Sequence, residues 1–527
     1  MKEILGKEKK FILITFLLVI IGGITSMITP IMIQYFNDQN VSLSFDIMLY
    51  IFLAMLVSYL LQIFMFVYRE NFAASFNVNY LFSLIKKVYD LKYDKLIEKE
   101  SSYLVNRIFT AVDSLYLFLV TSLSIVIKAG FIICLSLLVL FFISWKIFMV
   151  LLLLLPLNFF GFKYINKHLA LKMEKMQKDS ASANKDLIVT LSNSDNVKSQ
   201  ASRSAMEHLL KPQITAMYQS LANTNKYAQI TSNTITFINQ LVQNMTYIWT
   251  SILIVNQEFP VGNLIIISII IPMYYSALGD LSKANIDYKS LLTANDFIKN
   301  ELDANREALG DFPLTTIDHV TIDHPSFYLG EKKFSYDLNV VLEKGDIIYL
   351  EGDSGSGKSS LLRLLLNFRS STGIRVNDLP INEINNHDLR NRIAYISQTP
   401  TILSTSLEQN IGMGKKLSDA DKKSIQRSGI LGAILKDKNW QSILYENGGN
   451  LSGGEKQRIA ISRLMISDAD MYILDESISN IDKESAVAIM DFLLKNKKEK
   501  IILFTTHDKF FKRYANKRIN ISSGGTK

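Results

Sequence analysis

Long uncharged apolar runs crowd the N-terminal part of the chain, whereas apolar and charged residues are mixed from about Gly310 onward. A helix that crosses about 30 Å of hydrocarbon needs roughly 20 mostly apolar residues. Six runs meet or approach this length, at 11–32, 47–67, 116–143, 147–162, 227–257 and 259–279. The pattern predicts an all-α transmembrane domain of six helices followed by a water-soluble domain.

Lysines flank these runs and indicate how they are oriented. Lys2, Lys7, Lys9 and Lys10 precede the first run, and the long segments 68–115 and 163–226 are rich in lysine, whereas 37–46 has two aspartates and no basic residue. Positive residues favour the cytoplasmic side. We therefore expect cytoplasmic termini and two long cytoplasmic loops, which read as helices that turn back near 93–102 and 191–201.

Charge and cysteine usage exclude several classes of protein. The net charge of the 527 residues is +8, but its lysines border apolar runs, so a nucleic-acid partner is not expected. The single cysteine, Cys134, rules out a disulfide within the chain or a cysteine-based metal cluster. The first run lacks a signal-peptide cleavage pattern. The expectation is a multi-pass protein of the cell membrane, with its soluble domain in the cytoplasm.

A phosphate-binding loop follows the β-rich stretch 347–350 and precedes a leucine-rich helix. Glycines allow backbone N–H groups to close around phosphates at the positive end of the helix. Lys358 is expected to reach the β- and γ-phosphates of ATP, and the Ser359 hydroxyl to ligate Mg²⁺. The predicted nucleotide-binding residues are Gly352, Asp353, Ser354, Gly355, Ser356, Gly357, Lys358, Ser359 and Ser360.

An acidic pair ends the apolar stretch MYILDES. Parallel strands present ligand groups at their carboxyl ends. Asp475 is predicted to hold Mg²⁺ through water, and Glu476 to polarise the attacking water as the general base. An acidic pair alone is weak evidence, but behind a phosphate-binding loop it predicts an ATP hydrolase.

The segment 451–458, LSGGEKQR, resembles the signature motif of ATP-binding cassette (ABC) proteins, with Glu455 where the family usually has Gln. Ser452, Gly453 and Gly454 offer a hydroxyl and backbone amides at a helix N-terminus, which is a further anion site, and Glu455 is predicted with them as a nucleotide-binding residue. In the family this site caps the γ-phosphate held by the opposite subunit. The resemblance therefore implies a dimer with ATP sandwiched between two α/β nucleotide-binding domains of the P-loop (RecA-like) type, each with an α-helical subdomain.

Further positions match the family in order. The resemblance implies that Gln398 senses Mg²⁺ and the γ-phosphate, that His507 is the switch histidine, and that Asp482 lies in the loop 477–482 that couples the two ATP sites. The stretches after Gln398, with Leu403 in place of an aromatic, and at 446–448 resemble segments that touch the membrane domain. His324 holds the place of the tyrosine that stacks on adenine, with Phe327 and Tyr328 close by as alternatives.

The resemblance extends over nearly the whole chain and implies the exporter architecture. We expect a transmembrane domain at 1–300, a linker at 301–314 and an ABC nucleotide-binding domain at 315–527. A homodimer is favoured, because the catalytic carboxylate and signature glycines are intact, although a partner half-transporter stays open. Because few residues precede the first run, the protease domain of some peptide exporters is not expected. A peptide is the preferred cargo; lipids or hydrophobic drugs, import of metal chelates and an ATP-gated regulator are the alternatives.

Two membrane features bear on the cargo. Polar residues recur along the fifth run at Asn233, Thr236, Gln240, Gln243 and Asn244, and either line a cavity or join helices. Lys128 is a charge within the third run. It meets an acidic group on the cargo, snorkels to the interface or pairs within the protein.

Overall fold

The computed structural model describes residues 9–38, 45–256, 262–479, 481–496 and 499–521. Lys2, Lys7, the stretch 39–44, Gln257, Phe259 and Asn480 lie outside the described residues. Contacts divide the chain into two compact units. The first contains Met1–Leu91 and Lys95–Arg306, and the second contains Lys92–Asp94 and Glu307–Lys527.

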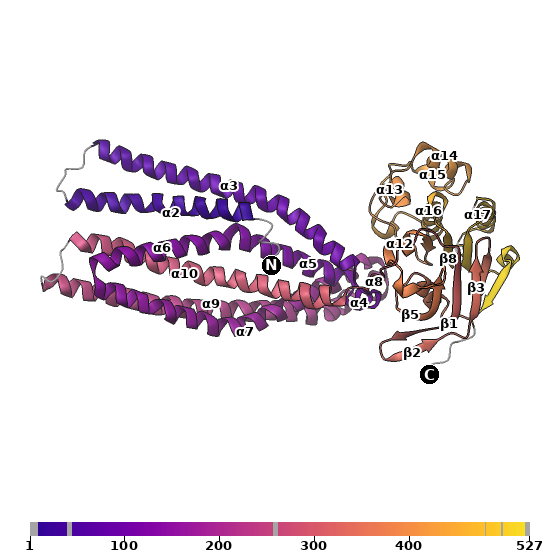
Figure 1. Cartoon of the computed structure of the whole chain (residues 1–527), viewed down its shortest axis with the longest axis horizontal. Coiled ribbons are helices and arrows are strands. Elements are labelled where there is room, and N and C mark those ends of the chain that lie inside the picture. The colour runs from indigo at the N-terminus through magenta and orange to yellow at the C-terminus, as the bar shows by residue number, and fades with distance from the viewer. Residues whose placement is uncertain (1–8, 39–44, 257–261, 480, 497–498, 522–527) are drawn as a thin grey trace. The chain divides into compact units, whose positions relative to one another are not determined.

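Helices form nearly all of the described part of the first unit, and short turns and an isolated β-bridge between Leu91 and Arg306 make up the rest (Figure 1). Short helices α4 (Tyr93–Lys99) and α8 (Ser194–Gln200) lie where the sequence predicts the two turns. Six long helical segments carry the six predicted apolar runs: α2 (Lys9–Asp38), α3 (Phe45–Tyr89), α5 (Ser101–Leu117) continued through the π-helical η1 (Phe118–Ser122) into α6 (Leu123–Ile143), α7 (Trp145–Ser192), α9 (Arg203–Val255), and α10 (Gly262–Phe297) with η2 (Ile298–Leu302) and η3 (Asp303–Asn305).

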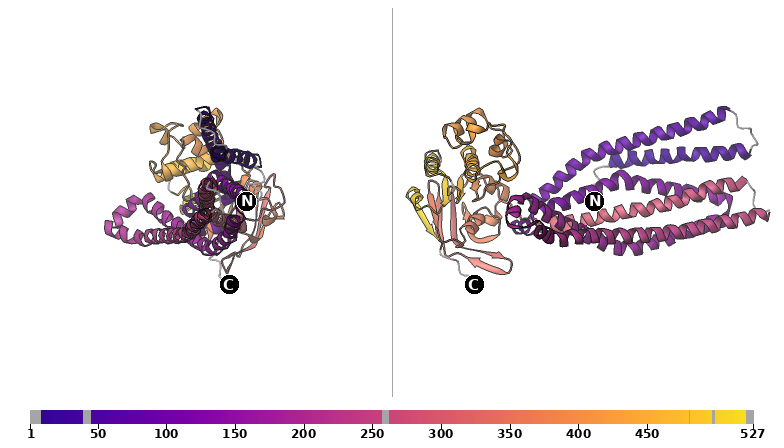
Figure 2. Two further views of the ribbon diagram at one scale, coloured as in Figure 1. Left: turned by 90° about the vertical axis from the view of Figure 1, so that its left-hand side faces the viewer. Right: turned by 180° about the vertical axis from the view of Figure 1, so that it is seen from behind.

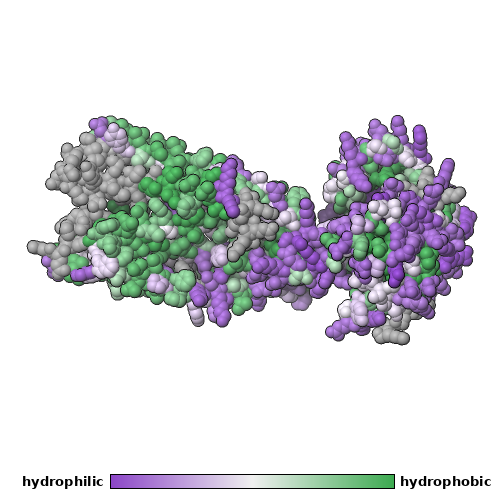
Figure 3. Space-filling model, viewed as in Figure 1, coloured by the Kyte–Doolittle hydropathy of each residue, from purple (hydrophilic) through white to green (hydrophobic). Residues whose placement is uncertain are grey.

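Apolar side chains cover the outside of these helices. Phe142 is 79% exposed and Leu153 is 71% exposed. On the face seen in Figure 3, apolar residues spread over the part of the bundle remote from α4 and α8. Within the described part of the chain, Phe52–Tyr89, Ser101–Ile143 and Trp145–Ser192 are long and apolar enough to cross a membrane. The first unit is therefore a multi-pass membrane domain.

Amide pairs join the helices of the bundle. Asn158 of α7 and Asn239 of α9 exchange two hydrogen bonds of 3.1 Å, and both side chains are buried. The predicted polar stripe lies elsewhere on α9, because Asn233, Gln240 and Asn244 are exposed in the single chain. The sequence-based interpretation missed Asn239, which makes the interhelical contact.

Two sheets form the second unit (Figure 2). An antiparallel sheet in the order β2-β1-β5-β6, with β3 also on β1, contains β1 (His319–Leu329), β2 (Lys332–Ser335), β3 (Asn339–Glu343), β5 (Ser371–Val376) and β6 (Leu379–Pro380). A parallel sheet in the order β10-β4-β9-β8-β7 contains β4 (Ile347–Glu351), β7 (Ile393–Ile396), β8 (Met471–Asp475), β9 (Ile501–Thr505) and β10 (Lys517–Asn520). Strands β8 and β9 are buried throughout, as continuous apolar runs in parallel sheets predict.

Helices cover the parallel sheet and form a separate lobe. Ile348, Leu362 and Ile473 belong to a core that includes α11 (Lys358–Leu365), and Tyr472 and Phe504 belong to a second core with α16 (Gly453–Ile466) and α17 (Lys483–Asn496). A third core belongs to the helical lobe of α13 (Leu407–Gly412), α14 (Asp419–Arg427) and α15 (Ile434–Asp437). The predicted fold class, including the helical subdomain, is confirmed.

Lys92–Asp94, which include the first two residues of α4, belong to the second unit. The ring of Tyr93 stacks on Phe368 with 5.0 Å between centroids, and Asp94 pairs with the Arg369 guanidinium at 2.6 Å. The observed division after Arg306 lies inside the expected linker, and the domain boundaries themselves stay a prediction.

Candidate functional site

The carboxyl ends of four parallel strands carry the predicted site residues. The phosphate-binding loop follows β4, Gln398 follows β7, Asp475 and Glu476 end β8, and His507 follows β9. Because the strands are parallel, these groups meet at one edge of the sheet. Ligands of open α/β sheets bind at this edge.

The phosphate-binding loop needs glycine for its backbone conformation. Gly355 and Gly357 have φ angles of 83° and 97°, which disfavour side chains, and Gly357 caps helix α11. The Lys358 ammonium donates to the carbonyls of Gly352, at 2.8 Å, and Asp353, at 3.0 Å. The lysine thus points back along its own loop.

The loop fits a polyphosphate. The Ser356 hydroxyl is buried without a hydrogen-bond partner among the described residues, so it is free to donate to an anion. A Cβ at Gly352 would lie 2.7 Å from this hydroxyl, and one at Gly357 would lie 2.8 Å from the Tyr336 hydroxyl. Tyr336, which we did not predict, donates to the Gly357 carbonyl at 2.9 Å and braces the loop.

Glu476 lies between two predicted partners. The Gln398 amide donates to Glu476 Oε2 at 2.6 Å, and His507 Nε2 lies 3.0 Å from Oε1. Glu476 adopts a positive φ of 51°, and its backbone N–H donates to the Thr505 hydroxyl at 2.8 Å. The carboxylate is mostly shielded at 16% exposure, whereas His507 is 64% exposed. The structure therefore brings the three predicted catalytic residues together.

Two hydroxyls hold the buried Asp475. Thr505 donates to Oδ1 at 3.2 Å, and Tyr395 donates to Oδ2 at 3.3 Å. Burial, assisted by the Asp475 charge, raises the pKa of Tyr395 to about 12, so this phenol stays a donor at neutral pH. Sequence reasoning missed both residues. Strand register places Thr505 opposite Asp475 across β8 and β9, and Tyr395 reaches Asp475 from the neighbouring strand β7.

The signature segment begins helix α16. Ser452 is its N-cap: its hydroxyl accepts from the Glu455 N–H at 3.2 Å, and Glu455 accepts from the Ser452 N–H at 2.7 Å. Glu455 thus completes a capping box, a role that Gln also fulfils. Ser452 and Gly453 stay exposed.

Asp482, the predicted coupling aspartate, is tied to its surroundings. It accepts from the Ser485 N–H at 2.9 Å and from Arg458 of α16. These donors, the backbone N–H of Ser485 first, lower the pKa of Asp482. The loop is therefore anchored to the signature helix.

The burial of the three candidate side chains narrows the choice of the residue that stacks on adenine. Phe327 is buried and stacks on Phe334 and Tyr336, so its ring belongs to the core. His324, at φ 44°, and Tyr328 are exposed on β1. The hydrogen bond that the imidazole donates to Asp323, followed by the charges of Asp323 and Asp337, raises the pKa of His324. Stacking by His324 stays a prediction.

Curated relatives align over different shares of their lengths. A probable ABC transporter ATP-binding/permease protein of Haemophilus influenzae is 33% identical over 216 residues, covering 40% of this chain and 39% of that protein. The lactococcin-A transport/processing ATP-binding protein LcnC of Lactococcus lactis is 24% identical, with 82% and 61% covered. The ATP-dependent lipid A-core flippase 2 of Colwellia psychrerythraea is 26% identical, with 83% and 78% covered. The first two alignments span less than two thirds of the relative.

Structure and family models agree on the architecture. A bacterial Atm1-family ABC exporter with ATP bound superposes with a TM-score of 0.87 at 17% identity, covering 98% of this chain and 94% of the other, which shows the same fold. The family model "ABC transporter transmembrane region" matches residues 12–278, about half of the chain, and "ABC transporter" matches 336–479. The chain therefore belongs to the ABC transporter family, as a half-transporter with the exporter fold in which one membrane region and one ATP-binding cassette are fused.

Proposed function

We propose that the protein is an ATP-driven exporter of peptides that acts as a dimer in the cell membrane, with its cassettes in the cytoplasm. The observation that carries the proposal is the position of Glu476, held between Gln398 and His507 at the sheet edge where the phosphate-binding loop begins. A carboxylate so placed is suited to take a proton from an attacking water.

Different residues would bind the triphosphate, hold Mg²⁺ and orient the Asp475 carboxylate. The loop from Gly352 to Ser360 would hold the triphosphate, with Lys358 turning from its own carbonyls to the phosphates. Ser359, Gln398 and Asp475 would hold Mg²⁺, which would neutralise phosphate charge when bound. Thr505 and Tyr395 keep the Asp475 carboxylate oriented.

Dimerisation completes the site. In one chain the signature residues Ser452 and Gly453 are exposed at the start of α16, where backbone N–H groups favour an anion. In a dimer they would cap the γ-phosphate bound by the other subunit. Because the chain has both an intact signature and Glu476, two copies would make two working sites, which favours a homodimer over pairing with a different half-transporter.

Two observations support a peptide as the cargo. Several relatives, such as LcnC, are named for both transport and processing, and a cargo that is processed as well as transported is most simply a polypeptide. The exposed amides Asn233, Gln240 and Asn244 of α9 can hydrogen-bond to peptide groups. The lipid A-core flippase among the relatives makes a lipid the second candidate.

The substitution Glu476→Gln tests the proposed ATPase in proteoliposomes that contain only this chain. We expect at least a hundredfold fall in ATP turnover with ATP binding retained, because only the proton acceptor is lost, and accumulation of a closed ATP-bound dimer. Glu484→Gln, an equivalent change at an exposed position of α17, is the control and should keep normal turnover. Normal ATPase activity of Glu476→Gln would refute the assignment, and inactive wild-type protein that recovers with a second half-transporter would refute the homodimer.

A further inference from the structure

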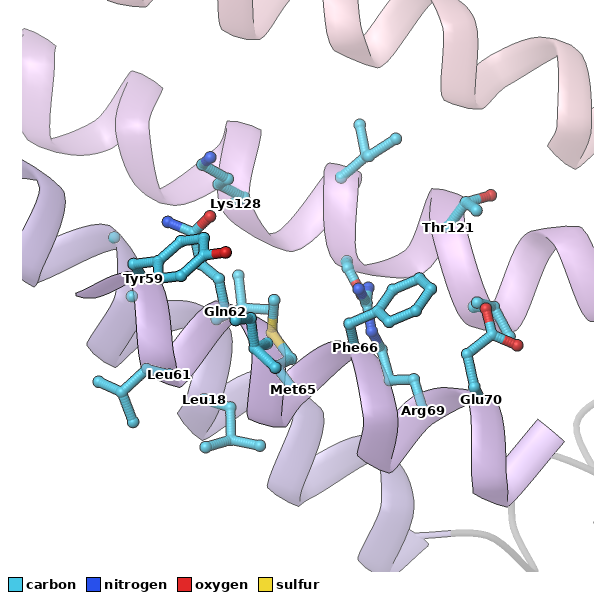
Figure 4. A pocket seen from close by; sticks show the side chains of 17 residues that line it. Leu18, Tyr59, Leu61, Gln62, Met65, Phe66, Arg69, Glu70, Thr121 and Lys128 are labelled. Carbon is cyan, nitrogen blue, oxygen red and sulfur yellow. The ribbon is translucent and has the colours of Figure 1, made fainter. Parts of the chain in front are cut away.

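A cavity of about 550 Å³ lies in the membrane unit between α2, α3 and the continuous segment η1–α6 (Figure 4). Its wall is largely apolar, with side chains such as Leu18, Met65 and Phe66. Polar and charged side chains also line it, among them Gln62, Arg69, Glu70 and Lys128. The cavity combines the apolar wall and few polar groups that are typical of ligand sites.

Neither of the two positive charges at this cavity forms an ion pair with a described residue, although Glu70, next to Arg69 in the sequence, lines the same cavity. The Arg69 guanidinium donates to the Ser124 hydroxyl, while its Nε is buried without an acceptor. Lys128 makes no hydrogen bond or ion pair to any described residue, so the internal-partner interpretation is not supported there. Glu70 is already engaged, because it accepts from the Tyr116 hydroxyl at 2.6 Å. Two cations and one carboxylate leave the lining with a net charge of +1.

The depth of Lys128 makes an unpaired charge costly. Lys128 lies fifteen positions before Ile143, the last residue of α6, and therefore about 22 Å from that end along the helix. That distance falls within the roughly 30 Å of a hydrocarbon core. Cations at such depth ordinarily pair or line a functional cavity. An anionic ligand would offset this cost.

The polar groups lie at two levels, which favours an extended ligand. Gln62 and Lys128 lie at one end of the view in Figure 4, and Arg69 and Glu70 lie toward the other. Along α3, seven residues separate Gln62 from Arg69, a rise of about 10 Å. A lipid with a single polar head would place its tail against the second polar level. A peptide carries polar groups along its length and fits both.

The helix wall is irregular at the same place. The π-helical turn η1 interrupts the helix at Phe118–Ser122 and contributes Val120 and Thr121 to the lining. Such π-bulges are frequent at functional sites, because they redirect side chains that a regular helix would turn away. This feature is independent of the charges and coincides with them.

We propose that this cavity binds carboxylates of the peptide cargo, one near Arg69 and one near Lys128, while its apolar wall holds the neighbouring cargo side chains. At one level the Arg69 guanidinium can hold a carboxylate with two parallel N–H donors, and at the other level the Lys128 ammonium can pair with a second carboxylate. The proposal rests on the proposed function, because it takes the cargo to be a peptide.

Binding of two matched peptides to the full-length protein in nanodiscs tests the proposal. The probes are fluorescently labelled octapeptides of Leu, Phe and Ser that end either in Asp with a free carboxylate or in Asn amide. Wild-type protein should bind the acidic peptide about tenfold more tightly, as expected of charge-assisted hydrogen bonds. Lys128→Gln and Arg69→Gln should each reduce this preference below about threefold, whereas Lys128→Arg should keep it. Lys146→Gln removes an exposed charge outside the cavity and should leave the preference intact.

Three outcomes would overturn the proposal. The two peptides could bind wild-type protein equally, the preference could survive in Lys128→Gln, or replacing phosphatidylcholine by phosphatidylglycerol could abolish peptide binding only while Lys128 is present. The last outcome would assign the cavity to a lipid headgroup. Lys128 is exposed, so its variants keep the test valid if Arg69→Gln fails to fold. ATP turnover is a separate readout: its absence alongside an intact acidic preference would refute the exporter function and not the cavity.

Discussion

The polar groups of the cassette and those of the membrane unit differ in the partners that the chain itself supplies. In the cassette, Asp475 and Glu476 are each held by hydrogen bonds from neighbouring strands or loops of one rigid sheet. In the membrane unit, Arg69 and Lys128 line a cavity, and neither forms an ion pair with a described residue. The difference indicates that the cassette is pre-organised for one reaction, whereas the membrane cavity depends on what enters it.

The same contrast appears inside the membrane unit. The buried amides of Asn158 and Asn239 satisfy each other, whereas Asn233, Gln240 and Asn244 on the same helix α9 as Asn239 are exposed. Buried helix-joining amides and exposed amides therefore lie on different faces of a single helix. Substitutions at the two kinds of position should have separable effects.

The largest effect on stability is expected from Gly357→Ala, which disturbs the pre-organised loop. A left-handed backbone costs alanine about 1–2 kcal/mol, and the new Cβ would lie 2.8 Å from the hydroxyl of the buried Tyr336, adding roughly 1–3 kcal/mol of overpacking. The free energy of unfolding without nucleotide measures both. Gly355→Ala has a similar φ of 83° and meets nothing within 4 Å, so it should destabilise by the backbone cost alone. Equal losses in the two variants would show that contact with Tyr336 does not matter.

A smaller loss, about 1 kcal/mol, is expected from Asn158→Leu. This substitution leaves the Asn239 amide buried between α7 and α9 without its partner. Stability in mixed detergent micelles is the measurement. The double variant Asn158→Leu with Asn239→Leu should recover most of the loss, and Asn233→Leu, at an exposed position of α9, should have little effect. A double variant less stable than the single one would contradict the pairing.

The smallest expected effect is a pH-dependent contribution of His324 to the stability of the cassette. Asp323 and Asp337 raise the pKa of its imidazole, so the contact stabilises the folded cassette at pH values below the ordinary histidine pKa. That contribution is lost as the pH rises through the raised folded pKa. His324→Asn should therefore lower the unfolding temperature slightly at pH 6 and leave it unchanged at pH 9. A larger difference in unfolding temperature between wild type and His324→Asn at pH 9 than at pH 6 would contradict this prediction.

Much of the site could be predicted because its signals are local. The spacing of glycines between a strand and a helix identifies the loop around Lys358, and Glu476 is identified because it follows an apolar strand. The rule that parallel strands present ligand groups at one edge then predicts that Gln398, Glu476 and His507 meet, as they do. The apolar runs likewise predict the membrane helices, because their length is set by the thickness of the bilayer.

The roles of other residues depend on contacts between segments that are distant in the sequence, and no local sequence pattern indicates these contacts. Tyr336 and Thr505 reach the site only through the packing of the loop and the register of β8 against β9. On α9, the periodicity of polar residues did not reveal that Asn239 is the buried one, because that depends on the rotation of the helix against α7.

The sequence by itself determined the order of the parts: six apolar helices, a phosphate-binding loop, a signature segment and an acidic strand end. Each of these parts is encoded by one continuous stretch of the chain. The tertiary structure alone decided that Arg69 of α3 and Lys128 of α6 line one cavity beside a π-helical turn. The physical reason is that a helix specifies which residues share a face, while the packing of neighbouring helices decides which faces meet.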